Sequence, residues 1–305
     1  MDNLTHSLIG AVLGQAGLKR KSGLAMPALI LAANLPDIDA PCALYGIESL
    51  AMRRGLSHGP LALLLLPPLL AWLLVRFDAW QARRGTRPAG RQPVHFGSLA
   101  MLCYIAALTH PAFDWLNNYG IRLLEPFSHR WFYGDALFII DPWLLAMLGA
   151  GTWLSLKRER QGSAEWYRPA RGAIAAVLAY VALNIGINGK AVLEVASDAP
   201  YPEEVVANPV PLAFWKREVL WRGADGTYGS FDWSVASGKG GGVPARPTGM
   251  DDPRVALRAK GDPAAQAFLF WSRMPVAESR GDTIILSDQR FQALGRDRFN
   301  VTLEP

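Results

Sequence analysis

Long apolar runs in the first 190 residues are the feature that most constrains this chain. Residues 60–75 read PLALLLLPPLLAWLLV, and similar runs occupy residues 97–108, 143–156 and 172–187. About 20 apolar residues in a helix cross the hydrocarbon core of a bilayer, and each run approaches that length with its uncharged neighbours. Two weaker segments, 8–18 and 24–35, precede them. We therefore expect an α-helical membrane bundle of about six segments.

The composition changes near residue 190. Half of the 305 residues are hydrophobic and 19% are charged, but the charged residues become frequent only in the last third. There, short runs such as TYGSFDWSV, QAFLFWSRM and DTIILSDQRF alternate with Gly, Pro and Asp, which is typical of strands and turns. The sequence predicts a membrane-embedded domain, 1–190, and a small, mainly antiparallel β-rich domain, 191–305.

Basic residues are concentrated in three short loops, 18–22, 76–91 and 157–171. The positive-inside rule places such loops in the cytoplasm, and alternate crossings put all three on that side of the inner membrane. Residues 34–59, 110–142 and the C-terminal domain then face the extracytoplasmic side. This topology accounts for the net charge of +5, so we expect membrane lipid as a partner and no nucleic acid. The start of the chain lacks the charge order of a signal peptide, and we expect it to be retained.

Histidines and aspartates gather at the predicted extracytoplasmic ends of these segments, although the topology was drawn from Lys and Arg alone. Each has an ordinary alternative: Asp141 before Pro142 is typical of a helix cap, and two residues four apart on one helix can simply hydrogen-bond. Together they are more informative, because ionisable groups near hydrocarbon are costly and tend to be functional. The group comprises His6, Asp37, Asp39, His58, His110 and Asp114, with His129, Asp135 and Asp141 as further candidates.

Three imidazoles and three carboxylates suit a divalent metal. Imidazole favours zinc, whereas carboxylate-rich sets also accept manganese or magnesium. Six candidate ligands exceed the four of one tetrahedral zinc, so we expect two ions, about 3.5–4 Å apart, of the kind that activate water for phosphoryl chemistry. Asp37 or Asp39 can also act as a general base if one of them is not a ligand.

The motifs LTHSLIG, NLPDID, RGLSHG, LTHPAFDWLNNYG, EPFS and DALFIIDPW occur in this order over residues 3–145. They resemble the membrane-bound metal-dependent hydrolase family that is related to zinc-dependent phospholipase C and the P1-type nucleases. NPVPLAFWKREV, FLFWSRMPV and LSDQRF resemble the tail domain of part of that family.

The resemblance implies a phospholipase C-like metal site. Its ligands would be His6, Asp37, Asp39, His58, His110 and Asp114. The soluble relatives also use an N-terminal amine and a later His-x-x-x-Glu pair, and this chain has no such pair. Arg54, in the RGLSHG motif, is a candidate for holding a substrate phosphate, with a lipid-facing role as its alternative.

The sequence therefore predicts an integral membrane hydrolase that cleaves a phosphoester of an amphiphilic substrate with metal-activated water. One alternative is a membrane protein that binds or transports cations with the same residues. Another is a non-catalytic membrane anchor whose β-rich domain binds a partner.

Overall fold

The computed structural model describes residues 1–197, 199, 202–294 and 299–305. The chain divides into two compact units. The first comprises residues 1–38 and 54–183, and the second comprises residues 39–53 and 184–305. The division inside helix α7 lies near the predicted boundary after residue 190, and that boundary stays a prediction. Each unit is described by itself.

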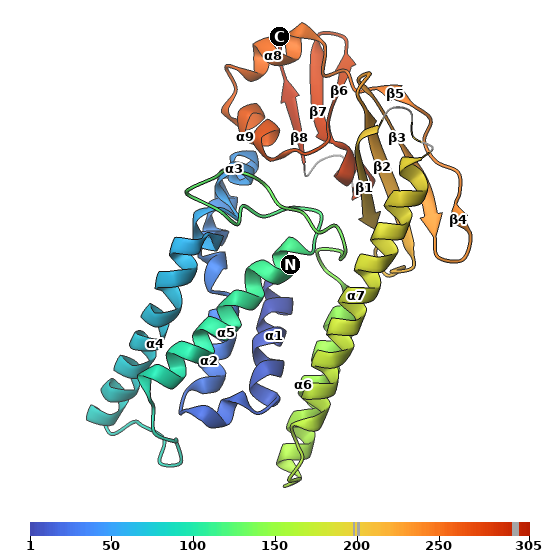
Figure 1. Cartoon of the computed structure of the whole chain (residues 1–305). Helices are drawn as coiled ribbons and strands as arrows, with labels where there is room; N and C mark the ends of the chain where they lie inside the picture. Colours follow the sequence, from blue (N-terminus) through green and yellow to red (C-terminus); the bar gives the residue numbers. More distant parts are fainter. Residues whose placement is uncertain (198, 200–201, 295–298) are drawn as a thin grey trace. The chain divides into compact units, whose positions relative to one another are not determined.

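The first unit is helical (Figure 1). Two short helices begin it, two long helices follow, and a long loop leads to a final pair. The elements are α1 (Asn3–Gln15), η1 (Leu18–Lys21), α2 (Ala25–Ala33), the start of η2 (Leu35–Glu48), η3 (Leu56–His58), α4 (Pro60–Arg83), α5 (Phe96–Trp115), α6 (Pro142–Arg160) and the first half of α7 (Arg168–Ala196).

Three helices in the described part of the chain, α4, α5 and α7, are long and apolar enough to cross a membrane. The prediction of about six membrane segments is therefore not supported. Helices α1 and α2 have 13 and 9 residues. At 1.5 Å per residue they reach only about 20 and 14 Å, against a hydrocarbon core of about 30 Å. Helix α6 has 19 residues, but its last turn carries Lys157, Arg158 and Arg160.

Helix α2 packs between α1 and α5, and α5 also packs along α4. Small side chains dominate the core of these contacts, including Ala28, Ala32 and Ala106, together with Leu29 and Leu102. Such residues let helix backbones approach closely, which supplies the van der Waals contact that holds helices together in lipid. The result is a tight four-helix cluster whose long members run antiparallel.

The second unit begins with the C-terminal part of α7 and the short helix α3 (Ser49–Met52). Its strands are all antiparallel and form two sheets in the described residues. One sheet has the order β1-β2-β3-β4, with β5 beside β3, and the other has the order β6-β7-β8. The strands are β1 (Pro202–Pro209), β2 (Lys216–Gly223), β3 (Thr227–Ser234), β4 (Gly238–Lys239), β5 (Arg246–Pro247), β6 (Pro275–Arg280), β7 (Thr283–Asp288) and β8 (Asn300–Leu303).

Helix α9 (Pro263–Trp271) corrects the strand expected at QAFLFWSRM, and a shorter helix, α8 (Pro253–Ala259), precedes it. The Asp262 side chain accepts backbone hydrogen bonds from Ala264 and Ala265, and Pro263 occupies the first turn. Both are helix-start signals. The apolar residues that suggested a strand instead form one buried helix face, with Phe268 and Trp271 three residues apart.

The first sheet is attached to the C-terminal part of α7. Ile187, Ala191 and Val195 pack with Val219 and Trp233 in one buried cluster. Beside it, the guanidinium of Arg217 is buried and donates to the side-chain oxygens of Asn184 and Asn188 on α7. Because a 29-residue helix is about 44 Å long, α7 exceeds the thickness of the hydrocarbon core, and its last turns are available to this sheet.

The contact between α1 and α2 provides a test of the packing. A Cβ atom at Gly10 would lie 2.6 Å from the carbonyl oxygen of Leu29. Gly10→Ala should therefore force the helices apart and lower the free energy of unfolding by about 1–3 kcal/mol. Gly149→Ala in α6 is the matched control, because no neighbouring atom lies within 4 Å of its Cβ position.

The control should be neutral or stabilising by up to about 1 kcal/mol, since alanine is the better helix former. Thermal unfolding of the detergent-purified protein, followed by size-exclusion chromatography, measures both variants. Equal melting temperatures for the two variants would contradict the predicted contact.

Candidate metal centre

Five of the six predicted ligands lie together in the first unit. They form two groups, His6 with His110 and Asp114, and Asp37 with His58 and His110. Within each group the potential ligand atoms lie within 4.8 Å of one another. Four helical elements supply them: His6 lies in the first turn of α1, Asp37 in η2 after α2, His58 in η3 before α4, and both His110 and Asp114 near the end of α5.

The spacing of the donor atoms matches that of ligands around one small cation. His58 Nε2 lies 3.2 Å from His110 Nε2 and 3.6 Å from Asp114 Oδ2. Asp37 Oδ1 lies 3.8 Å from His58 Nε2 and 3.6 Å from His110 Nε2. Tetrahedral zinc with bonds of about 2.0–2.1 Å separates its ligand atoms by about 3.3 Å. Asp37 and Asp114 therefore each approach both imidazoles at a spacing that suits ligands of a divalent metal.

Asp114 presents its two oxygens to different neighbours. Oδ2 faces His58 and His110, whereas Oδ1 lies 3.3 Å from His6 Nε2 and accepts a hydrogen bond from the amine of Met1. Burial lowers the pKa of that amine to about 6, although the nearby Asp114 carboxylate acts in the opposite direction. Asp114 therefore contacts His58 and His110 through one oxygen and His6 through the other, and His110 is the residue that the two groups share.

The imidazole of His110 is oriented by the backbone of α2. Its Nδ1 atom donates to the carbonyl oxygen of Ala33 over 2.7 Å. A carbonyl can only accept, so Nδ1 carries the proton and the lone pair of Nε2 points into the cluster. His58 Nδ1 similarly lies 3.0 Å from Ser57 Oγ. Such outer contacts are characteristic of metal-binding histidines.

Burial is the second observation that favours a ligand role. The five side chains belong to residues that are between 0% and 9% exposed. His6 Nδ1 is buried and has no hydrogen-bond partner in the described part of the chain. An uncompensated polar nitrogen is costly in a buried position. The donor types, their spacing and their burial together fit a divalent cation.

Arg54 lies against the cluster from the side of η3. Its Nε is 3.2 Å from Asp114 Oδ2, and its Nη1 donates to Asn117 Oδ1 and the Gly120 carbonyl. The guanidinium also stacks over Tyr119, and the backbone of Arg54 adopts the left-handed conformation, with φ of 54°. These contacts are those of a residue that positions Asp114, and the predicted contact with a substrate phosphate stays a prediction.

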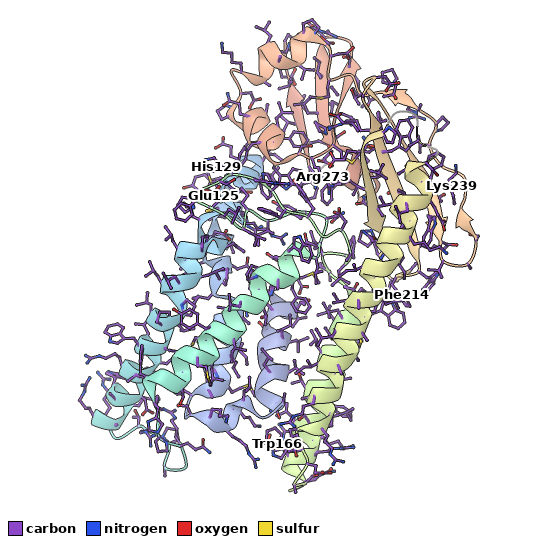
Figure 2. All side chains as sticks on the ribbon, in the orientation of Figure 1. Glu125, His129, Trp166, Phe214, Lys239 and Arg273 are labelled. Atoms are coloured by element: carbon purple, nitrogen blue, oxygen red, sulfur yellow. The ribbon has the colours of Figure 1, made fainter. Side chains whose placement is uncertain are left out.

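The remaining candidates lie outside both groups. Asp39 belongs to the second unit, so its predicted ligand role stays a prediction. Asp141 caps α6, accepting hydrogen bonds from the backbone of Trp143 and Leu144 and from the Tyr180 hydroxyl. The side chain of His129 is largely exposed and lies 2.8 Å from Glu125 Oε1 (Figure 2). Asp135 is in neither metal-binding group of the described residues.

Arg122 and Glu125 form a buried ion pair that was not predicted from the sequence. Their loop packs tightly on the turn that carries His58: the Arg122 amide donates to the Arg54 carbonyl, and a Cβ at Gly59 would lie 2.1 Å from the Glu125 carbonyl oxygen. The only sequence signal was the EPFS motif, which contains Glu125. These backbone contacts hold the loop against the turn that carries His58.

Comparison with known protein families decides where this chain belongs. Residues 1–191 match the family described as YdjM inner membrane protein, which is more than half of the 305 residues. The chain belongs to the YdjM inner membrane protein family. No curated protein and no solved structure matches it. Membership and the three apolar helices support location in the inner membrane. The match contains all six predicted ligands and ends before the β-rich part.

The cluster predicts tight binding of zinc by the purified full-length protein. His58→Ala and His110→Ala each remove one donor, so each should weaken zinc binding by about a hundredfold or more. His95→Ala is the matched control, because this exposed histidine lies in neither group. Isothermal titration with zinc measures the affinity, and elemental analysis gives the stoichiometry. Equal losses in all three variants would contradict the site.

The Arg54 contacts predict a separate effect. Arg54→Lys keeps the charge but loses the forked geometry that reaches Asp114, Asn117 and Gly120, so zinc affinity should fall by about tenfold. Titration of the full-length variant with zinc tests this role. Unchanged zinc affinity combined with a raised KM for a phosphoester would instead assign Arg54 to the substrate.

Proposed function

We propose that this chain is an integral membrane, metal-dependent hydrolase that cleaves a phosphoester of an amphiphilic substrate. The observation that carries the proposal is the convergence of two carboxylates, Asp37 and Asp114, on His58 and His110 in a nearly solvent-free site. The Nε2 atoms of the two histidines lie 3.2 Å apart, and each lies 3.5–3.8 Å from an oxygen of either carboxylate. Imidazole with carboxylate favours zinc, and a bound zinc ion lowers the pKa of water to about 7 and polarises phosphoryl oxygens.

A second ion is supported by the arrangement of the donors. His110 has only Nε2 available, because its Nδ1 donates to Ala33, so it serves one ion. Asp114 offers an oxygen to each group, and His6 lies beside Oδ1. In this proposal Asp37, His58 and His110 would hold one ion, and His6 and Asp114 would contribute to the other.

The protein's own residues also supply proton transfer and orientation. Asp37 directs Oδ1 toward the two histidines. A carboxylate beside an attacking water can accept its proton. Asp37 is our candidate for this role, and Asp39 is the alternative base. Arg54 holds Asp114 in place through its Nε atom, which keeps the donor set arranged before a substrate enters.

The substrate class follows from where the site lies along the helices. His58 precedes the start of α4 by two residues, and Asp114 is one residue from the end of α5. Both helices are candidate spans, so the cluster belongs at headgroup depth rather than at the midplane. We assign this end to the extracytoplasmic side, because the basic loops lie at the opposite helix ends. A phospholipid or lipid-linked phosphate can place its phosphate at this depth.

Hydrolysis by the purified protein tests the proposal. The zinc-loaded chain should cleave a phosphodiester, assayed with bis(p-nitrophenyl) phosphate and with phospholipids in mixed micelles, and chelation should abolish turnover until zinc is restored. Asp37→Asn should lower kcat by about 10²-fold or more, because it removes both a ligand charge and a candidate base. His95→Ala should leave kcat unchanged.

Two results of these assays would contradict the proposed hydrolase. Stoichiometric zinc without turnover on either substrate class would reject hydrolysis while keeping the metal site. Zinc-dependent cation flux in vesicles would then assign the same residues to transport.

A further inference from the structure

The opposite end of the first unit carries a basic surface that the proposed hydrolase does not use. It consists of η1, the last turn of α6 and the first turns of α7. Residues 18–21 and 157–171 contain eight basic residues against two carboxylates, an excess of six positive charges. We call this region the basic end surface. Figure 2 shows Trp166 at this end, where α6 and α7 meet.

Direct contacts hold the three segments together. Lys19 pairs with Glu159 of α6, and its ammonium group lies 4.4 Å from the ring centre of Trp166. The guanidinium of Arg171 donates from Nε to the carbonyl of Ala16 at the end of α1. Ser155 donates to the Trp166 carbonyl, which ties α6 to the segment before α7. The charges therefore belong to one built surface rather than to separate loops.

Most of these charges are not neutralised within the protein. Glu159 pairs with Lys19 and Glu165 pairs with Arg168. Six other basic residues are exposed and form no ion pair with a carboxylate in the described part of the chain: Arg20, Lys21, Lys157, Arg158, Arg160 and Arg171. The other long basic loop differs, because Asp78 at the end of α4 pairs with both Arg87 and Arg91.

Aromatic rings indicate the depth of this surface in the bilayer. Trp153 is 61% exposed, and Lys157 lies 5.4 Å from its ring centre. Arg20 lies 5.4 Å from the Trp166 ring and Arg171 lies 4.3 Å from the Tyr167 ring. Tryptophan and tyrosine concentrate at the membrane–water interface. Cations held beside them lie at the level of the lipid headgroups.

We propose that the basic end surface is a binding site for the phosphate headgroup of an anionic phospholipid. The exposed guanidinium and ammonium groups of Arg20, Lys21 and Arg158 supply the charge, and the exposed ring of Trp153 borders the acyl region. Basic pockets between membrane helices bind anionic headgroups through such groups. This site is separate from the metal centre, because η1 follows the C-terminal end of α1 whereas His6 lies in its first turn.

Native mass spectrometry of the full-length protein tests the proposal. The purified protein is titrated in detergent with phosphatidylglycerol and, separately, with phosphatidylcholine, which has the same phosphate but no net charge. The parent protein should retain phosphatidylglycerol in preference to phosphatidylcholine. Each cation near the headgroup contributes about fivefold to binding, so Arg20→Gln with Lys21→Gln should weaken phosphatidylglycerol binding by about 25-fold.

Two further double variants make the result specific. Arg83→Gln with Arg84→Gln removes the same charge from exposed residues of another loop and should change binding by less than about twofold. Arg20→Lys with Lys21→Arg keeps the charge and should retain binding. Arg158→Gln with Arg160→Gln tests the same surface from α6, in case the first variant fails to fold, and should also weaken binding by about 25-fold.

Three outcomes would overturn the proposal. One is equal retention of the two lipids by the parent protein. Another is an equal loss of binding in the Arg83/Arg84 variant, which would indicate nonspecific attraction. The third is full displacement of phosphatidylglycerol by millimolar inorganic phosphate, which would identify a site for a free anion. Zinc affinity, measured in parallel, should be unchanged in every variant, so this test is separate from that of the hydrolase.

Discussion

Burial of Asp114 at the end of a membrane helix is the constraint on which the rest of the first unit depends. A carboxylate in this position is tolerated only if it is surrounded by compensating groups, because an unpaired buried charge costs several kcal/mol. Both carboxylate oxygens have such neighbours. The Met1 amine and His6 lie beside Oδ1, and His58, His110 and Arg54 lie beside Oδ2. These groups come from three parts of the chain: Met1 and His6 lie at the start of α1, Arg54 and His58 lie just before α4, and His110 shares α5 with Asp114. The ends of α1, α4 and α5 must therefore meet at one point.

The lengths of the helices make this meeting possible. The long helices α4 and α5 run antiparallel, which brings the start of one beside the end of the other. Helices α1 and α2 are too short to cross the hydrocarbon core, and their role is to deliver His6 and Asp37 to the same place. The two short helices approach closely at Gly10, and the small residues of α2 allow close packing against α5. This packing lets the imidazoles of His6 and His110 stack with ring centres 3.7 Å apart. The two ends of the unit then differ chemically, with mutually compensated ligands at one and uncompensated cations at the other.

Several features of the fold were predictable from sequence because they depend on local pattern. The apolar run at residues 60–75 lies within α4, and the alternation after residue 200 predicted antiparallel strands. Asp141 followed by Pro142 predicted a helix start, and the structure confirms it.

The predictions that failed also have physical causes. Residues 8–18 and 24–35 are as apolar as membrane spans, but hydropathy alone does not determine helix length. Helices α1 and α2 are too short to cross the hydrocarbon core. QAFLFWSRM was interpreted as a strand because its aromatic content outweighed the capping signal at Asp262 and Pro263.

The sequence by itself determined the kinds of chemistry available to this protein. It contained imidazoles and carboxylates next to apolar segments, and the distribution of Lys and Arg grouped them on one side. Only the tertiary structure decided which of them meet. It brought Asp37 to within 3.8 Å of His58 and assigned Asp39, two residues later, to another unit. It also turned Arg54 toward Asp114 and revealed the buried Arg122–Glu125 pair. The physical reason is that donor atoms separated by as many as 108 residues converge only through helix packing, which no local pattern encodes.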